Sequence, residues 1–370
     1  MKKAQITLFI IIGVVALMTF GMLMYSQSGV RKISEQDFLA SATLSEDLKP
    51  VYQYVASCLL NSTNEALFLL GKQGGYIYAS QGGAQEDLDN TYSVLSPLDS
   101  FRVPYEEMMI ARNQGNCRVT GSDYPWAWFA PGNTANDCFI NPISSYPPLK
   151  RTFTPSEIIS KLIRRPNPLG GPTIQDNMET FIATKLPNCL NLSSFQNMKV
   201  TAEAPPVVHV DIGNNTAVYA EYPLKIEKAG DVSELTQFYV RSDVNLSGIY
   251  NFMRMIKYED SRDFAFKVHG KQSGTLLAEV ICQEPTFSIV RISDSATPSF
   301  SIQYARQNRA PALLPGIITA VPCDINAVTT PAYYDPDDDN NLALSVNELT
   351  PGKCTVTVTD GALSTSRSYQ

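Results

Sequence analysis

Histidines, basic residues and catalytic motifs are scarce in this sequence. Only His209 and His269 occur among 370 residues, and the patterns H-E-x-x-H, G-x-S-x-G and Cys-x-x-Cys are absent. These patterns mark zinc peptidases, hydrolases and thiol redox proteins. Lysine and arginine total 29 against 36 acidic residues, and the net charge of −7 argues against a nucleic-acid partner. We therefore expect a protein that is not an enzyme and does not bind nucleic acid.

Charged side chains are also missing between Lys3 and Arg31. From Ile6 to Tyr25 the chain is almost entirely apolar, and about 20 such residues cross a hydrocarbon core of about 30 Å as a helix. No other stretch is as long and apolar, so the rest of the chain lies on one side of a membrane. The stretch exceeds the usual signal-peptide core of about 7–15 residues and has no small-x-small cleavage site after it. It predicts a retained hydrophobic helix within residues 1–30.

Seven cysteines and four N-x-[ST] sequons follow this helix. Basic residues flank the helix on both sides, so the positive-inside rule alone does not orient it. Cysteines and sequons together are typical of an oxidising space outside the cytoplasm, and they place the remaining chain outside the cell. The candidate glycosylation sites are Asn61, Asn191, Asn214 and Asn245.

The cysteine count predicts three disulfides with one cysteine left over. A Cys117–Cys138 bond would close a loop of about 20 residues and stabilise the fold by about 3 kcal/mol in the chain-entropy model. Cys58 and Cys189 each precede a leucine at a helical element, which suggests a long-range bond, although spacing does not establish connectivity. Cys282 lies in a candidate strand; if it is unpaired and buried it is an inert apolar residue, and if it is exposed it could link subunits.

Hydrophobic periodicity predicts an α+β fold. Helical spacing and caps indicate helices over residues 45–71, 154–163 and 173–187, with Pro187 as the stop of the last one. A glycine-rich hairpin around a short strand, Tyr76–Tyr78, follows the first helix. Alternating residues indicate antiparallel strands at 199–201, 207–211, 217–222 and 238–240, then near 264–269, 275–283 and 286–304. An amphipathic helix over 246–260 should cover one face of the first of these sheets.

These patterns divide the chain into four expected domains. They are the hydrophobic helix 1–30, a helical and loop-rich region 31–195, an antiparallel sheet with a helix at 196–305, and a C-terminal module 306–370. Within the second region, Trp126 and Trp128 lie between Cys117 and Cys138 and form a candidate contact surface. The alternative is that both rings fill the domain core.

The first residues carry a resemblance to a known family. Lys2-Lys3-Ala4-Gln5 followed directly by an apolar helix resembles the short basic leader of archaeal type IV pilin-like proteins, the class III signal peptide. The likeness covers about 25 residues and implies that a prepilin peptidase cuts between Ala4 and Gln5. Phe9 stands where the family often has glutamate. The resemblance implies a filament in which many such helices bury one another's apolar faces.

The C-terminal module carries a second resemblance. An acidic turn at 335–339, a strand at 345–346 and the segment TVTVTDG at 355–361 resemble immunoglobulin-like and cadherin-like β-sandwich modules of surface proteins. The likeness covers about 40 residues and implies a sandwich bridged by Cys323 and Cys354. The chain stops where a final strand would begin or continue, so the sandwich is either incomplete or completed by strand addition from another subunit.

The same acidic turn is the strongest candidate for a metal site. Alternating carboxylates on a turn supply the oxygen ligands that Ca²⁺ prefers, although the complete EF-hand pattern is missing. The alternative is a solvated acidic turn without metal. The candidate ligands are Asp335, Asp337 and Asp339, with Asp338 and Asp360 beside them.

The sequence predicts a non-enzymatic surface protein in two alternative forms. In the first, it is a pilin-like filament subunit that contacts the membrane and copies of itself through its N-terminal helix. In the second, it is a single-pass anchored adhesin or binding module, with surface glycans or host proteins as partners. No cofactor is expected apart from candidate calcium.

Overall fold

The computed structural model describes residues 45–87, 93–106, 147–151, 171–195, 197–262, 266–308, 311–313, 333–334, 342–350 and 353–369. The chain divides into one unit of residues 1–52 and a second of residues 53–370. Among the described residues, no helix is long and apolar enough to cross a membrane. The hydrophobic stretch at residues 2–25 lies outside the described residues. The described elements form an α+β fold, as the sequence predicts.

Helix α3, Lys49–Lys72, confirms the first predicted helix. Pro50 lies in its first turn, where the missing backbone N–H has no intrahelical acceptor to lose. Its buried side is mainly apolar, and Val55, Leu59 and Leu70 are fully inaccessible to solvent. Repetition of apolar residues three and four positions apart is therefore what fixes the orientation of this helix.

Gly71 lies where α3 meets strand β10, Ser301–Gln307. A Cβ atom added at Gly71 would lie 2.2 Å from the backbone oxygen of Ser301. A real Cβ never approaches a backbone oxygen so closely, so either the helix or the strand would have to move. The absence of a side chain at this position allows the close approach of the two elements.

We predict that Gly71→Ala lowers the free energy of unfolding by about 1–3 kcal/mol, the usual cost of overpacking. The steric conflict should exceed the gain in helix propensity, which is at most about 1 kcal/mol. Gly213→Ala is the matched control, because the nearest atom to its added Cβ is the Asn215 oxygen at 3.6 Å. Urea denaturation of both variants measures the difference, and equal stability of Gly71→Ala and the parent chain would contradict the close packing.

The glycine-rich segment after α3 is not the predicted hairpin. Tyr76, Ile77 and Tyr78 are buried, and Tyr78 makes only an isolated bridge to Gln85 before the short helix η2, Ala79–Gln81. The side chains of Gln73 and Gln81 bond each other at 2.9 Å, and Gln73 also donates to the Tyr76 carbonyl. These amide side chains form hydrogen bonds with backbone groups of the loop, such as the Tyr76 carbonyl, that a partner strand would otherwise bind.

Helix α6, Ile174–Cys189, confirms the helix predicted to open at Thr173. Thr173 caps it by accepting a hydrogen bond from the Asp176 backbone N–H at 3.0 Å. The expected stop at Pro187 is wrong, because the helix continues to Cys189 with Pro187 in its last turn. A proline so close to the end removes one hydrogen bond but does not prevent the final residues from staying helical.

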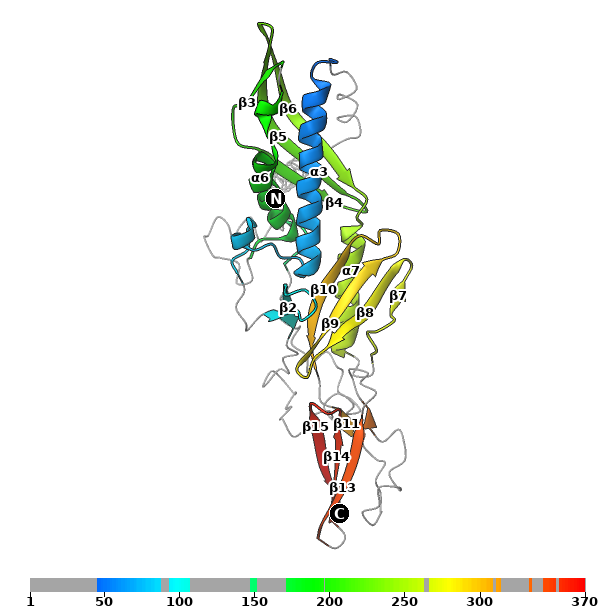
Figure 1. The fold of residues 1–370 in the computed structure, drawn as a ribbon. Coiled ribbons are helices and arrows are strands. Elements are labelled where there is room, and N and C mark those ends of the chain that lie inside the picture. The colour runs from blue at the N-terminus through cyan, green and yellow to red at the C-terminus, as the bar shows by residue number, and fades with distance from the viewer. Residues whose placement is uncertain are drawn as a thin grey trace, which may run out of the picture. The chain divides into compact units, whose positions relative to one another are not determined.

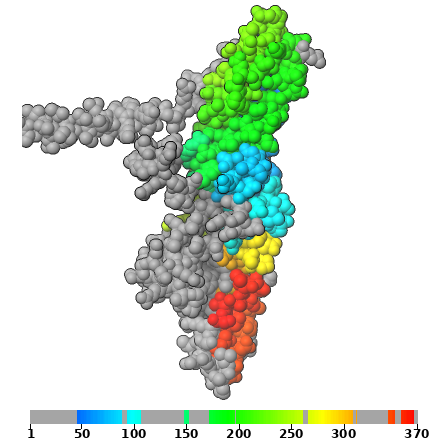
Figure 2. Space-filling view, turned by 90° about the vertical axis from the view of Figure 1, so that its left-hand side faces the viewer, coloured from blue at the N-terminus to red at the C-terminus, as the bar shows by residue number. Residues whose placement is uncertain are grey.

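The first sheet confirms the predicted antiparallel strands. Long strand β5 pairs with β3 and β4 along one edge and with β6 along the other. Helix α6 packs on β4, whose alternate residues Val208, Val210 and Ile212 are buried (Figure 1). Together α6 and these strands form one continuous surface in green and yellow-green (Figure 2). The strands are β3 Lys199–Ala202, β4 Val207–Ile212, β5 Thr216–Lys228 and β6 Asp231–Ser242.

A second sheet has six strands in the order β1-β2-β10-β9-β8-β7. Strand β2 pairs with β10 in parallel, whereas the other neighbours are antiparallel. The region expected to be helical and loop-rich thus supplies two strands to a sheet formed mainly after residue 270. The segment expected as one strand at 286–304 forms two. The remaining strands are β1 Ser93–Leu95, β2 Arg102–Glu106, β7 Gln272–Ser273, β8 Leu276–Gln283 and β9 Phe287–Asp294.

Helix α7, Leu246–Arg262, confirms the predicted amphipathic helix but not its partner. It was expected to cover the sheet formed by β3 to β6, and instead it packs on β8, β9 and β10 (Figure 1). Its buried residues Ile249, Met253 and Ile256 are fully inaccessible. An apolar stripe specifies which side of a helix is buried, and either sheet could satisfy it.

The C-terminal described residues form a three-stranded antiparallel sheet in the order β13-β14-β15. Val356 and Val358 of the central strand are buried on one face, and Thr357 points to the other face, where its hydroxyl lies 2.7 Å from that of Ser366. Strand β15 follows the TVTVTDG segment, at the position where a final strand is expected to begin or continue. The strands are β11 Ala312–Leu313, β12 Tyr333–Tyr334, β13 Ala343–Thr350, β14 Lys353–Thr359 and β15 Ser364–Tyr369.

Candidate functional site

Helix α6 joins distant parts of the chain at both of its ends. At its C-terminal end, Cys189 forms a disulfide with Cys58 of α3, across 131 residues of sequence, with the two Cα atoms 5.8 Å apart. Cys58 is buried, whereas Cys189 is exposed. The pairing is the one that the sequence suggested, so the fold contains the expected long-range covalent link.

The segment after α6 is held to α3 by further contacts. The Tyr54 hydroxyl accepts a hydrogen bond from the Asn191 backbone N–H at 2.9 Å, and its ring meets that of Phe195 edge to face, with centroids 5.7 Å apart. On the neighbouring surface, the Lys185 ammonium lies 3.0 Å from a Glu65 carboxylate oxygen. The main chain around the disulfide is therefore fixed while its outer side remains open to solvent.

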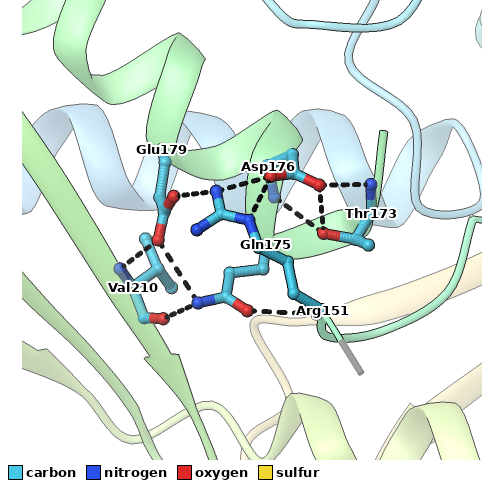
Figure 3. A network of polar contacts seen from close by, with 6 residues as sticks. All are labelled: Arg151, Thr173, Gln175, Asp176, Glu179 and Val210. Atoms are coloured by element: carbon cyan, nitrogen blue, oxygen red, sulfur yellow. Dashed lines mark hydrogen bonds and ion pairs between the residues drawn. The ribbon is translucent and has the colours of Figure 1, made fainter. Parts of the chain in front are cut away.

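A network of charged side chains occupies the N-terminal end of α6 (Figure 3). The Arg151 guanidinium donates from Nε to Asp176 Oδ1 at 2.5 Å and from a terminal nitrogen to Glu179. Asp176 Oδ2 also accepts hydrogen bonds from the Thr173 backbone and hydroxyl, at 2.8 and 2.7 Å. One arginine thus binds two carboxylates that are three residues apart and therefore lie on the same face of the helix.

The same network reaches the first sheet through β4. Glu179 accepts a hydrogen bond from the Val210 backbone N–H at 3.0 Å, and Gln175 donates to the Val210 carbonyl at 2.9 Å (Figure 3). The two side chains therefore satisfy both backbone groups of one strand residue. Because Arg151 binds Glu179 from the other side, residues 147–151, α6 and β4 are connected through a single set of polar contacts.

Both partners of the ion pair stay charged over a wide pH range. Burial acts to raise the pKa of Asp176, but hydrogen bonds from Thr173 and Arg151 outweigh it and lower that pKa. Burial likewise acts to lower the pKa of Arg151, and its bonds to Glu179 and Asp176 raise it overall. Because the pKa of Asp176 is lowered and that of Arg151 is raised, neither of these two groups exchanges a proton near neutral pH, and the pair serves to hold residues 147–151 to α6.

We predict that Arg151→Ala lowers the free energy of unfolding by about 1–2 kcal/mol at neutral pH. Loss of a charged hydrogen bond costs about 1.5–3 kcal/mol, and the 40% exposure of the arginine side chain reduces that figure. Lys199→Ala is the matched control, because it removes a positive charge from a pair whose lysine is 70% exposed. Urea denaturation of both variants is the measurement, and an equal loss in both would contradict the network's role.

The stability difference should also depend on pH. Because the folded-state pKa of Asp176 is lowered, its contribution is fully present above the pKa of the unfolded chain, about 3.9, and is lost as pH falls through the folded-state value. The gap between the parent chain and Arg151→Ala should therefore narrow as the pH falls below about 4. A gap that stays constant down to acid unfolding would show that Asp176 is not the partner that matters.

A second ion pair is buried between α7 and β10. Arg306 donates from Nε and from a terminal nitrogen to the two carboxylate oxygens of Asp260, at 2.8 and 3.1 Å. Their side chains are 4% and 9% exposed. The two-point geometry leaves both charges neutralised in a region from which water is largely excluded.

Of the predicted metal ligands and their neighbours, only Asp360 lies among the described residues. Asp335, Asp337, Asp338 and Asp339 lie outside the described residues. Asp360 is described, and its Oδ1 accepts hydrogen bonds from the backbone N–H groups of Ala362 and Leu363 in the turn after β14. No group of three or more His, Cys, Asp or Glu side chains in the described ranges is arranged to hold a metal ion.

Several other predicted site residues also lie outside the described residues. They are Ala4, Gln5, Cys117, Trp126, Trp128, Cys138 and Cys323. Cys354 is described, buried and disulfide-bonded. Cys282 is free and half-buried, and burial together with the neighbouring Glu284 carboxylate raises the pKa of its thiol. A raised pKa keeps the thiol protonated and weakly nucleophilic at neutral pH.

The four sequons lie at very different places in the fold. Asn61 is on the exposed side of α3, Asn191 follows α6, and Asn214 is in the turn between β4 and β5. All three asparagines are exposed. Asn245 is half-buried, and its Oδ1 accepts a hydrogen bond from the Gly248 backbone N–H at 2.9 Å at the start of α7.

Sequence reasoning missed Arg151, Glu179 and the Asp260–Arg306 pair. Asp176 could have been found from its spacing, because an acidic residue three positions after Thr173 fits a capping box. The partners of the two arginines lie 25 to 46 residues away in sequence, and no local pattern links them. Searches against protein-family models, curated proteins and solved structures found no match to this chain.

Proposed function

We propose that the protein is a non-enzymatic surface protein located outside the cell, and that it is a pilin-like filament subunit assembled through its N-terminal helix. The observation that carries the location is the Cys58–Cys189 disulfide, which joins two helices across 131 residues. Such bonds persist in oxidising compartments and are rare in the cytosol. The absence of charged residues from residue 4 to residue 30 supports a membrane or filament-core role for this N-terminal segment.

The C-terminal module supports a role at the surface. We propose that residues 306–370 belong to an immunoglobulin-like sandwich that binds calcium through Asp335, Asp337 and Asp339. In its favour, β13 to β15 form an antiparallel sheet with Val356 and Val358 buried on one face and hydroxyl side chains on the other. One apolar and one polar face is the pattern of a sheet in a sandwich.

The mature N-terminus and the state of assembly test the filament proposal. Mass spectrometry should find a terminus at Gln5, and electron microscopy should find filaments that contain the chain. Ala4→Leu removes the small residue before the cut and should retain the leader, whereas Lys3→Arg keeps the basic leader and should be processed normally. A terminus at Met1 in a protein that stays monomeric in detergent would contradict a filament subunit.

The alternative is a single-pass anchored adhesin, with surface glycans or host proteins as partners. It is favoured by the exposed hydroxyl-bearing face of β13 to β15, because uncharged hydrogen-bonding surfaces suit such contacts. Deletion of residues 1–30 separates the two proposals. A binding module should stay folded and keep its ligand, whereas a filament subunit should lose assembly.

A further inference from the structure

We infer that Asn191 is the glycosylation site that the folded protein presents, and that the other sequons can be modified only before the chain folds. The inference rests on the proposed location outside the cell. An oligosaccharide is transferred when an enzyme reaches the asparagine amide and the hydroxyl two residues later in one exposed segment. The structure shows both groups for every sequon, so accessibility can be compared site by site.

In two sequons, the hydroxyl-bearing residue is buried in the protein interior. Thr63 completes the Asn61 sequon inside α3, where it is fully buried and donates to the Leu59 carbonyl at 2.8 Å. Thr216 completes the Asn214 sequon at the start of β5, where it is also fully buried and donates to the Val244 carbonyl at 3.2 Å. Each asparagine is exposed, but an enzyme would have to open a helix or a strand to read its hydroxyl.

The Asn245 sequon is used as a helix cap. Its side-chain oxygen accepts the Gly248 backbone N–H, and the residue between the sequon's two ends, Leu246, is fully buried. Capping by asparagine is worth about 1 kcal/mol, so removal of this side chain from the helix end opposes transfer. The half-buried position of Asn245 adds a steric barrier.

The Asn191 sequon has none of these obstacles. Asn191 and Ser193 are both exposed, and the Ser193 hydroxyl donates to the Asn191 side-chain oxygen at 2.6 Å. Asn191 follows α6 as the N-cap of the short helix η4, Leu192–Ser194, and Ser193 lies within that single turn. The amide and hydroxyl therefore already lie side by side on the surface.

The surrounding contacts hold this sequon in place without covering it. The Asn191 backbone N–H is bound by Tyr54, and Cys189 is bonded to Cys58 two residues before the sequon. Contacts with α3 thus hold the backbone, while both side chains of the sequon are exposed to solvent. A rigid exposed segment lowers the entropy cost of binding to a transferase.

The transfer is a substitution at the first sugar of a lipid-diphosphate-linked oligosaccharide. A bond forms between Asn191 Nδ2 and C1 of that sugar, and the bond from C1 to the diphosphate oxygen breaks. The lipid diphosphate leaves with the electron pair, and Nδ2 gives one proton to a base of the transferase. No oxidant or reductant is required.

An in vitro transfer assay tests the inference. The full-length chain in detergent, with disulfides intact, is incubated with an oligosaccharyltransferase and a lipid-diphosphate-linked oligosaccharide, and each asparagine is scored by peptide mass spectrometry. We expect occupancy at Asn191 at least about tenfold above that at Asn61, Asn214 or Asn245, because modification there requires local opening. After reduction and denaturation, Asn61 and Asn214 should become occupied as well.

Matched variants isolate the sequon itself. Ser193→Ala should abolish modification of the folded chain, Ser193→Thr should preserve it, and Asn61→Gln should leave it unchanged. With an enzyme shown to be active on an N-x-T peptide, a folded chain left unmodified at Asn191, or modified equally at Asn61, overturns the inference. The assay uses purified components, so it tests the accessibility of Asn191 and does not depend on where the protein is located in the cell. If the proposed location outside the cell is wrong, protein isolated from its native source should carry no glycan, whatever the assay shows.

Discussion

The Cys58→Ser, Cys189→Ser double variant is expected to lose about 5 kcal/mol of unfolding free energy. In the chain-entropy model, a cross-link that closes a loop of 131 residues stabilises the folded state by this amount because it restricts the unfolded chain. The Tyr54 contacts to the segment around Asn191 remain in the variant, but each such hydrogen bond contributes only about 1 kcal/mol. Most of the link between α3 and the end of α6 should therefore be lost.

Urea denaturation of the oxidised parent and of the double variant measures this loss. Cys282→Ser is the matched control, because Cys282 is free and half-buried, and it should change stability by less than about 1 kcal/mol. The parent should also lose more stability on addition of a reductant than the double variant does. If the parent and the double variant unfold at the same urea concentration, the disulfide does not contribute to the fold.

Local patterns in the sequence were sufficient for helices α3, α6 and α7 and for most of the described strands, whereas the helix predicted at 154–163 lies outside the described residues. In α3, apolar residues such as Val55, Leu59 and Leu70 recur on one side, and their burial follows from that spacing alone. In β4, the alternation of apolar and polar residues from Val208 to Ile212 is matched by burial of every second residue. Both periodicities are defined by residues close together in sequence, so they predict the secondary structure without knowledge of tertiary contacts.

Tertiary context decided the features that the sequence did not reveal. Helix α7 packs on β8 to β10 and not on the sheet that precedes it, because its apolar stripe fits either sheet. The loop after α3 has the glycines of a hairpin, but the amide pair of Gln73 and Gln81 holds it in another conformation. A contact between two side chains eight residues apart is not visible in a pattern of turn residues.

The candidate sites divide in the same way. The Cys58–Cys189 bond could be suggested because each of these cysteines precedes a leucine at a predicted helical element. Arginine and carboxylate side chains are common on any surface, so nothing marked Arg151 or Arg306 as members of networks. The exposed state of Asn191 and Ser193 likewise follows from where α6 ends, two residues later than Pro187 suggested.

Removal of one member of the buried Asp260–Arg306 pair should be nearly as damaging as loss of the disulfide. Asp260→Ala leaves the Arg306 guanidinium in a site where the side chain is only 4% exposed. The variant removes two charged hydrogen bonds from a guanidinium that cannot recover its hydration there, and breaking a buried pair in this way typically costs about 3–5 kcal/mol. Because the pair joins α7 to β10, we expect unfolding at lower urea concentration without a change in the folded-state spectrum.

A solvent-accessible pair on the same sheet provides the control. Arg291 and Glu279 are also 2.8 Å apart, but their side chains are 40% and 31% exposed, so Glu279→Ala should cost less than about 1 kcal/mol. Replacement of both buried charges, as Asp260→Leu with Arg306→Met, should restore most of the stability lost by Asp260→Ala, since the desolvation penalty disappears with the charges. A double variant that is less stable than Asp260→Ala would show that the two side chains stabilise the fold through contacts other than their mutual ion pair.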